Sequence, residues 1–97
     1  MHRWIVILED RPQEEARRIR KERFEEHFAF LQANFYRIVF SCGLMNTTGE
    51  AETSHGGFWV VEAGSKEEVV ELFKQDPYFQ LGLRERIDVF RAHDGYA

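Results

Sequence analysis

The stretch Asp76–Leu83, which reads DPYFQLGL, is the most informative part of this 97-residue chain. It follows a segment with helical spacing, and Pro77 disfavours the helical conformation in the residue before it. We therefore expect Asp76 to lie where a helix ends, with its carboxylate free to contact something other than its own backbone. The aromatic pair and Gly82 predict a tight, partly buried turn after it.

Working outward from this turn, the first half of the chain reads as a strand followed by a helix. Residues Arg3–Leu8 form a β-branched and aromatic run, and Pro12 fits a first helical turn because its missing N–H would be unpaired there. Helical spacing then extends from Gln13 to about Ala33. One arc of this helix carries four apolar side chains: Phe24, Phe28, Leu31 and Phe35. Charged side chains spaced (i, i+4) lie on the more solvent-exposed face of this helix.

Two further strands are predicted at Tyr36–Cys42 and Phe58–Ala63. The segment between them, Gly43–Gly57, is rich in Gly, Asn, Thr and Glu and is longer than a tight hairpin needs. We expect it to be a loop, and a loop of this length can cover a binding site.

The second helix begins at a capping-box spacing formed by Ser65 and Glu68. Val69, Leu72 and Phe73 follow at helical intervals, so the helix has an apolar face. Arg84–Arg91 closes the chain as a last strand. The order is β-α-β-β-α-β, which is typical of an α+β ferredoxin-like fold: an antiparallel four-stranded sheet with two helices on one face. We expect a single domain over residues 1–97.

Both faces of the predicted sheet are apolar. In the first strand Trp4, Val6 and Leu8 point to one side, and Ile5 and Ile7 point to the other. Helices can cover only one side, so the other side needs a partner, and a chain this short buries a modest core. A homodimer formed through the sheet face satisfies both constraints.

Composition narrows the partners and the compartment. The formal net charge of −4 gives no electrostatic basis for binding nucleic acid. The single cysteine, Cys42, excludes an intrachain disulfide and fits a reducing, cytoplasmic compartment. The apolar run Trp4–Leu8 is too short for a membrane span, so we expect no membrane partner.

His27 is the leading candidate for chemistry in the first helix. On a helical wheel Arg20 and Arg23 lie within about 40° of it on either side, at the border of the apolar arc. Imidazole is the common general acid or base near neutral pH, although a half-buried histidine is also compatible with a purely structural role. His55, in the polar segment, is a weaker candidate. Cys42 reads as a small apolar strand residue, and no histidine or acidic pair has a metal-site spacing, so no metal is expected.

Four features in order resemble the YciI-like (YCII-related) family. They are a histidine followed by hydrophobic residues in the first helix (His27), Gly43 at the end of the second strand, Gly57 entering the third, and the Asp-Pro-aromatic turn at Asp76. The resemblance covers nearly the whole chain. It departs from the family pattern at Phe24, where members often carry an arginine, and at Leu44, where the glycine is often followed by proline.

The resemblance implies a dimeric α+β barrel, in which two sheets pack face to face, with His27 and Asp76 as an active-site pair. In that role His27 moves a proton and Asp76 orients it, in a cofactor-free lyase, isomerase or dehalogenase-type reaction on a small aromatic or lactone-like molecule. Arg20 or Arg23 would attract an anionic group of the substrate, and the Tyr78 hydroxyl could reach a ligand. The alternative is a non-catalytic small-molecule-binding or accessory dimer, because a fold alone does not fix function.

Overall fold

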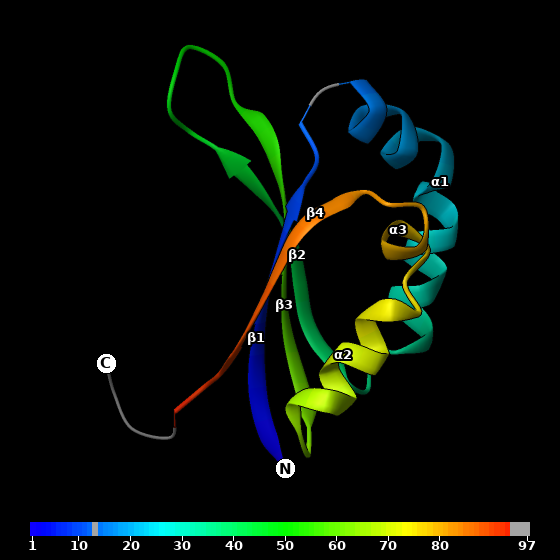
Figure 1. Ribbon diagram of the computed structural model, residues 1–97, viewed down its shortest axis with the longest axis vertical. Coiled ribbons are helices and arrows are strands. Elements are labelled where there is room, and N and C mark those ends of the chain that lie inside the picture. Colours follow the sequence, from blue (N-terminus) through cyan, green and yellow to red (C-terminus); the bar gives the residue numbers. More distant parts are fainter. Residues whose placement is uncertain (13, 94–97) are drawn as a thin grey trace.

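The computed structural model describes residues 1–12 and 14–93, which form an antiparallel sheet with all its helices on one face (Figure 1). The elements are β1 (His2–Asp10), α1 (Glu14–Ala33), β2 (Ile38–Asn46), β3 (Thr53–Ala63), α2 (Lys66–Lys74), α3 (Pro77–Gln80) and β4 (Arg84–Arg91). The strand order is β2-β3-β1-β4, and every neighbouring pair is antiparallel. The predicted α+β ferredoxin-like fold is confirmed. The short α3 at the Asp-Pro turn is an addition to it.

The core lies between the sheet and the helices. Along β1 the buried side chains Trp4, Val6 and Leu8 alternate with partly exposed ones, as a strand with one covered face requires. Residues of β2, β3 and the buried face of α2 complete the cluster: Ile38, Trp59, Val61, Ala63, Val69, Leu72 and Phe73. Fully burying one such side chain contributes roughly 1.5–3 kcal/mol, so this layer supplies most of the packing energy.

The second helix begins as the capping box predicts. The Ser65 hydroxyl accepts a hydrogen bond from the Glu68 N–H at 3.3 Å. The Glu68 carboxylate reaches back to the N–H of Gly64 at 2.8 Å, one residue before the position expected for a capping box. Two backbone donors at the start of the helix, the N–H groups of Gly64 and Glu68, are thus paired with side-chain acceptors.

The predicted loop Gly43–Gly57 is wrong, because the hairpin strands continue through most of it. Gly43 pairs with Gly57 inside the ladder, and Asn46 pairs with Thr53 near its end. Only residues 47–52 connect β2 to β3, with Gly49 in the left-handed region at φ 101°. The hairpin tip projects beyond the rest of the sheet (Figure 1), so both of its faces reach solvent and its composition is polar for that reason rather than because it is a loop.

The aromatic arc of α1 is not buried in the core, which differs from the expectation for an apolar helix face. Phe24 and Phe28 stack on each other at a centroid distance of 5.8 Å but are 54% and 48% exposed. The residues of α1 that are buried are Ala16, Ile19 and His27. The predicted end of this helix at Ala33 is confirmed, whereas its predicted start at Gln13 and the predicted domain end at residue 97 lie outside the described residues.

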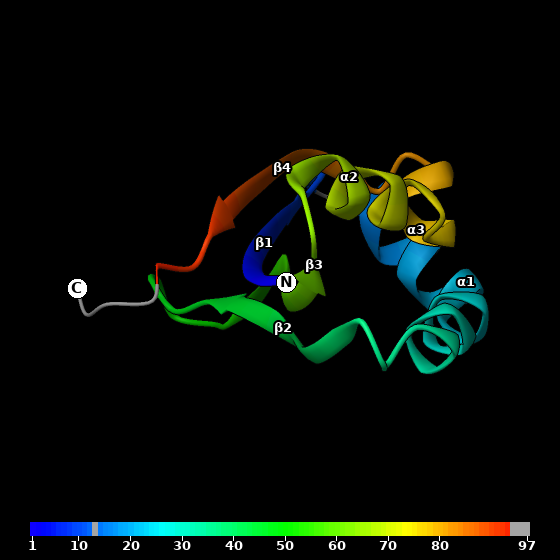
Figure 2. The ribbon, with the colours of Figure 1, turned by 90° about the horizontal axis from the view of Figure 1, so that it is seen from below.

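The sheet face opposite the helices carries an apolar row that crosses all four strands. Phe40 of β2 pairs with Val60 of β3, Val60 with Ile5 of β1, and Ile5 with Phe90 of β4. Phe40 and Phe90 are both 53% exposed. Figure 2 shows the helices gathered on the other side of the sheet. Water contact with such a row is unfavourable, so this face is suited to pack against a second copy of the chain.

We predict that the chain is a dimer in dilute solution and that Phe40→Glu weakens dimerisation by about thirtyfold or more, the scale of an interface hot spot. Sedimentation equilibrium measures this directly. Phe35→Glu is the matched control, because Phe35 is 73% exposed in the turn after α1 and lies away from the row. A wild-type monomer whose melting temperature is independent of protein concentration would contradict the prediction.

Candidate functional site

A cavity of about 290 Å³ lies between α1, the turn at α3 and the helix-facing side of the sheet. Its lining combines apolar side chains with three basic ones. The residues are Arg20, Phe24, His27, Phe28, Leu31, Ser41, Cys42, Gly43, Gly56, Gly57, Trp59, Tyr78 and Arg84. The cavity therefore brings together Arg20, His27 and Tyr78 from the sequence-predicted site.

Two glycines create the space. Gly43 of β2 pairs with Gly57 of β3, and side chains at these helix-facing positions would fill the gap between sheet and helix. Gly56, next to Gly57, also lines the cavity. A Cβ on Gly56 would clash with the backbone carbonyl of Leu8, so only glycine fits there. A Cβ on Gly57 would lie 3.7 Å from Nη2 of Arg84, which shows that this glycine leaves the guanidinium uncovered on that side.

His27 and Asp76, which are far apart in sequence, meet at the cavity. Nδ1 of His27 lies 2.8 Å from Oδ1 of Asp76, so the predicted contact is confirmed. His27 is 9% exposed and Asp76 is fully buried. Because an ionised carboxylate can only accept a hydrogen bond, a hydrogen bond from His27 to ionised Asp76 requires the proton on Nδ1 and leaves Nε2 outside this contact.

Asp76 also caps its own turn, which corrects the expectation that its carboxylate would leave the local backbone. Oδ1 accepts the N–H of Tyr78 at 3.1 Å as the N-cap of α3. One carboxylate oxygen thus serves both the turn and His27. The Asp-Pro sequence places the cap, and the cap aims the carboxylate at α1.

Tyr78 packs flat against the histidine. The two rings are 3.9 Å apart between centroids and inclined by 11°. The Tyr78 hydroxyl donates to the backbone carbonyl of Arg20 at 3.1 Å, so it is engaged within the protein while the ring lines the cavity. Burial raises the pKa of Tyr78 above its ordinary value, against the opposing effect of the Arg20 and Arg84 cations.

A buried ion-pair network adjoins the pair and was missed by sequence reasoning. Asp10, at the end of β1, accepts from Arg20 through Oδ2 and from Arg84 through Oδ1, each at 2.6 Å. Burial lowers the pKa of Arg84, and the neighbouring Asp10 carboxylate opposes that change. A signal was available in the sequence: Asp10 ends the first strand and Arg84 begins the last, and these ends are paired in the antiparallel topology.

The sequence model of the YCII-related domain matches residues 2–93. The chain belongs to the YCII-related family. The resemblance inferred from the sequence is thereby confirmed.

A similar solved structure is 5-chloro-2-hydroxyhydroquinone dehydrochlorinase (TftG) from Burkholderia phenoliruptrix AC1100, in complex with 2,5-dihydroxybenzoquinone. The TM-score is 0.81 at 23% sequence identity, with 96% of this chain and 95% of that chain covered. At this identity the likeness shows the shared fold. A search of curated proteins gives no match.

Arg23, the other arginine predicted for the YCII-related site, is not among the residues that line the cavity. Its guanidinium lies 2.9 Å from the Glu26 carboxylate on the surface of α1, and its side chain is 48% exposed. Arg20 and Arg23 are on opposite sides of His27 on the helix, so only one of them can turn toward Asp10 and the sheet.

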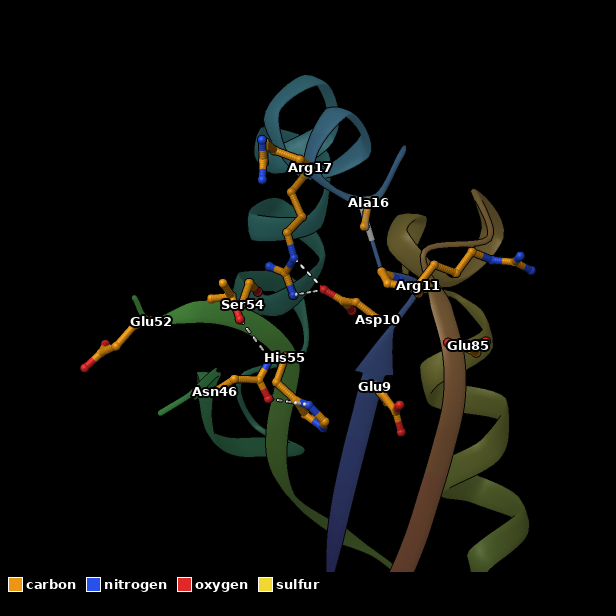
Figure 3. A pocket seen from close by; sticks show the side chains of 13 residues that line it. Glu9, Asp10, Arg11, Ala16, Arg17, Asn46, Glu52, Ser54, His55 and Glu85 are labelled. Atoms are coloured by element: carbon orange, nitrogen blue, oxygen red, sulfur yellow. Dashed lines mark hydrogen bonds and ion pairs between the residues drawn. The ribbon is translucent and has the colours of Figure 1, made fainter. Parts of the chain in front are cut away.

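A second cavity of about 640 Å³ opens at the other end of α1, between Asp10 and the hairpin (Figure 3). His55 lies in its wall and contacts Asn46 across the hairpin at 3.1 Å. This second cavity is lined by both acidic and basic side chains, and Arg20 lines it as well as the first cavity.

Within residues 1–12 and 14–93, no three His, Cys, Asp or Glu side chains are grouped so that they could hold a metal ion. Among the helices of the same residues, none has the length and hydropathy of a membrane span.

We predict that Tyr78 makes the fold sensitive to alkali. Because its pKa is raised in the folded chain, the unfolded chain loses this proton first as the pH rises past about 10, so the free energy of unfolding falls above that pH. Tyr78→Phe should be about 1 kcal/mol less stable at pH 7, because one hydrogen bond is lost, yet lose less stability between pH 9 and 11. Urea unfolding at each pH measures both effects. The control is Tyr36→Phe, since Tyr36 is exposed, and equal alkaline slopes in the two variants would contradict the prediction.

Proposed function

We propose that this protein is a small-molecule enzyme in which His27 acts as general base and acid and Asp76 orients it. The observation that carries the proposal is the 2.8 Å contact between Nδ1 of His27, which lines the cavity, and the fully buried Asp76. A carboxylate in this position fixes the tautomer with Nε2 unprotonated. It also stabilises the imidazolium that forms when Nε2 takes a proton.

The cavity lining supports a flat, partly anionic ligand. The stacked pair Phe24 and Phe28, together with Trp59, offers aromatic surface, and Arg20 and Arg84 offer positive charge. A volume of about 290 Å³ is at the small end for ligand pockets, so the proposed ligand is a single-ring molecule. The neighbouring dehydrochlorinase fits this class, because its bound molecule is a dihydroxybenzoquinone.

The proposed reaction is an elimination or isomerisation initiated by proton removal. In loss of HCl, a hydroxyl proton is first moved to the chlorine-bearing ring carbon, which gives a ketone tautomer in which that carbon is tetrahedral. Nε2 of His27 then takes the proton of a second O–H group conjugated with this carbon, the released pair forms a C=O bond, the ring double bond shifts, and the C–Cl bond breaks with its pair on chloride. Atoms and electrons balance without an oxidant or a cofactor. Arg20 is proposed to hold the anionic group of the substrate. Arg20 lines the cavity and Arg23 does not, so Arg20 is the stronger candidate.

Two further features belong to the same proposal. The enzyme is proposed to act as a homodimer joined through the sheet face that carries Phe40 and Phe90, which leaves the cavity on the helix side free. We also place it in the cytoplasm, because its single cysteine, Cys42, is free and exposed and suits a reducing compartment.

We predict that His27→Ala and Asp76→Asn each lower turnover by about a hundredfold or more while retaining ligand binding. Chloride release from 5-chloro-2-hydroxyhydroquinone and from related chlorinated hydroquinones is the turnover assay. The double variant should be little worse than the worse single one, because the two residues act as one unit. An unchanged rate in a folded His27→Ala protein would leave the non-catalytic binding protein as the better account.

We also predict that Gly43→Val blocks the cavity without disturbing the pair. Gly43 pairs with Gly57, whose added Cβ would face Leu8 and Arg84 on the helix side, so a side chain at 43 points the same way. Binding of 2,5-dihydroxybenzoquinone, measured by calorimetry, should weaken by at least tenfold. Thr48→Val is a control in the exposed hairpin tip, away from both cavities' lining. Equal affinity in Gly43→Val and wild type would place the ligand elsewhere.

A further inference from the structure

Asp76 uses its two carboxylate oxygens unequally. Oδ1 accepts hydrogen bonds from His27 and from the backbone of Tyr78. Oδ2 is buried and has no hydrogen-bond partner among the described residues. The charged group near Oδ2 is the Arg84 guanidinium, whose Nη2 lies 3.9 Å away. A buried carboxylate oxygen needs a compensating charge, and Arg84 supplies it.

Arg84 is itself held in place by Asp10. Its Nη1 donates to Oδ1 of Asp10 at 2.6 Å, and its side chain is 2% exposed. Its Nε has no hydrogen-bond partner among the described residues. The guanidinium is therefore fixed by one strong contact on the Asp10 side, which leaves Nη2 directed at Asp76 across a longer distance.

The charges around His27 can be counted from these contacts. Two carboxylates, Asp10 and Asp76, face two guanidinium groups, Arg20 and Arg84, and the Tyr78 ring covers the face of the imidazole. With His27 neutral the cluster has no net charge. Protonation of His27 would leave a net positive charge in a mostly buried site, which is unfavourable.

We propose that Arg84, fixed by Asp10, is a positioning residue that keeps Asp76 ionised and keeps His27 neutral in the resting protein. Asp76 alone would favour the imidazolium. By sharing the carboxylate, Arg84 takes part of that attraction away, so Nε2 of His27 remains unprotonated and ready to accept a proton. The catalytic meaning of this arrangement rests on the proposed function, but the arrangement itself can be tested without turnover.

The test is the protonation state of His27 in the full chain, read from its side-chain ¹⁵N chemical shifts at pH 7. His27→Gln assigns the signal among the four histidines. Arg84→Met removes a cation and should raise the ratio of doubly to singly protonated His27 by about tenfold, the scale of one unit charge in a protein interior. Asp10→Asn removes an anion and should lower the ratio by a similar factor.

Two further variants separate this role from a merely structural one. Arg84→Lys keeps the charge and should leave the ratio within about twofold of wild type. The double variant Asp10→Asn/Arg84→Met removes one charge of each sign and should also return the ratio close to wild type. A residue that only supports the fold would change the melting temperature without these opposite and cancelling shifts.

Shifts of the same sign in the two single variants, or no shift in either, would overturn the proposal. If Arg84→Met does not fold, Arg84→Gln takes its place, because a glutamine can still donate to Asp10. These readings are independent of activity. An inactive protein with the expected shifts would count against the proposed enzyme and not against the role of Arg84. An active protein without the expected shifts would count against the role of Arg84 and not against the proposed enzyme.

Discussion

The interaction on which the site depends is the buried Asp76 carboxylate. It begins α3 by accepting the N–H of Tyr78, it binds His27 of α1, and it faces Arg84 at the start of β4. One side chain therefore contacts α1, which is distant in sequence, as well as the neighbouring elements α3 and β4. Removing one partner from a buried charged pair typically costs about 3–5 kcal/mol, because the other charge is left uncompensated. The position of the turn and the orientation of the imidazole are thus coupled.

Burying three charges, Asp10, Asp76 and Arg84, is an inefficient way to stabilise a chain of this size. Apolar residues of similar volume would often be as stabilising as the pairs that Asp10 makes with Arg20 and Arg84. What an apolar replacement could not supply is a fixed positive potential beside the cavity and a counter-charge for Asp76. Under the proposed function, the network would serve the proton transfer proposed for His27 more than the free energy of folding, and such arrangements cluster at functional sites.

The sequence predicted the parts of the fold that local chemistry determines. It also predicted the contact of His27 with Asp76, which local chemistry does not determine. Strand alternation in β1 and the Ser65 cap follow from spacing, and the last strand Arg84–Arg91 has its predicted bounds. The contact of His27 with Asp76 required the family pattern, because no local signal joins residues so far apart. The hairpin was missed because polar residues fit an exposed strand as well as a loop. The role of Arg84 depends on antiparallel pairing with β1, which sequence periodicity alone does not specify.

The cavity itself is an argument for function. Gly43 and Gly57 forgo side chains at helix-facing positions where a buried valine would contribute roughly 1.5–3 kcal/mol each. Phe24 and Phe28 line the same cavity and are half-exposed. A chain selected only for stability would fill this space. The glycines instead leave an aromatic-walled opening with His27 and two guanidinium groups in its lining. The proposed small-ligand site would account for both the missing packing and the buried charges.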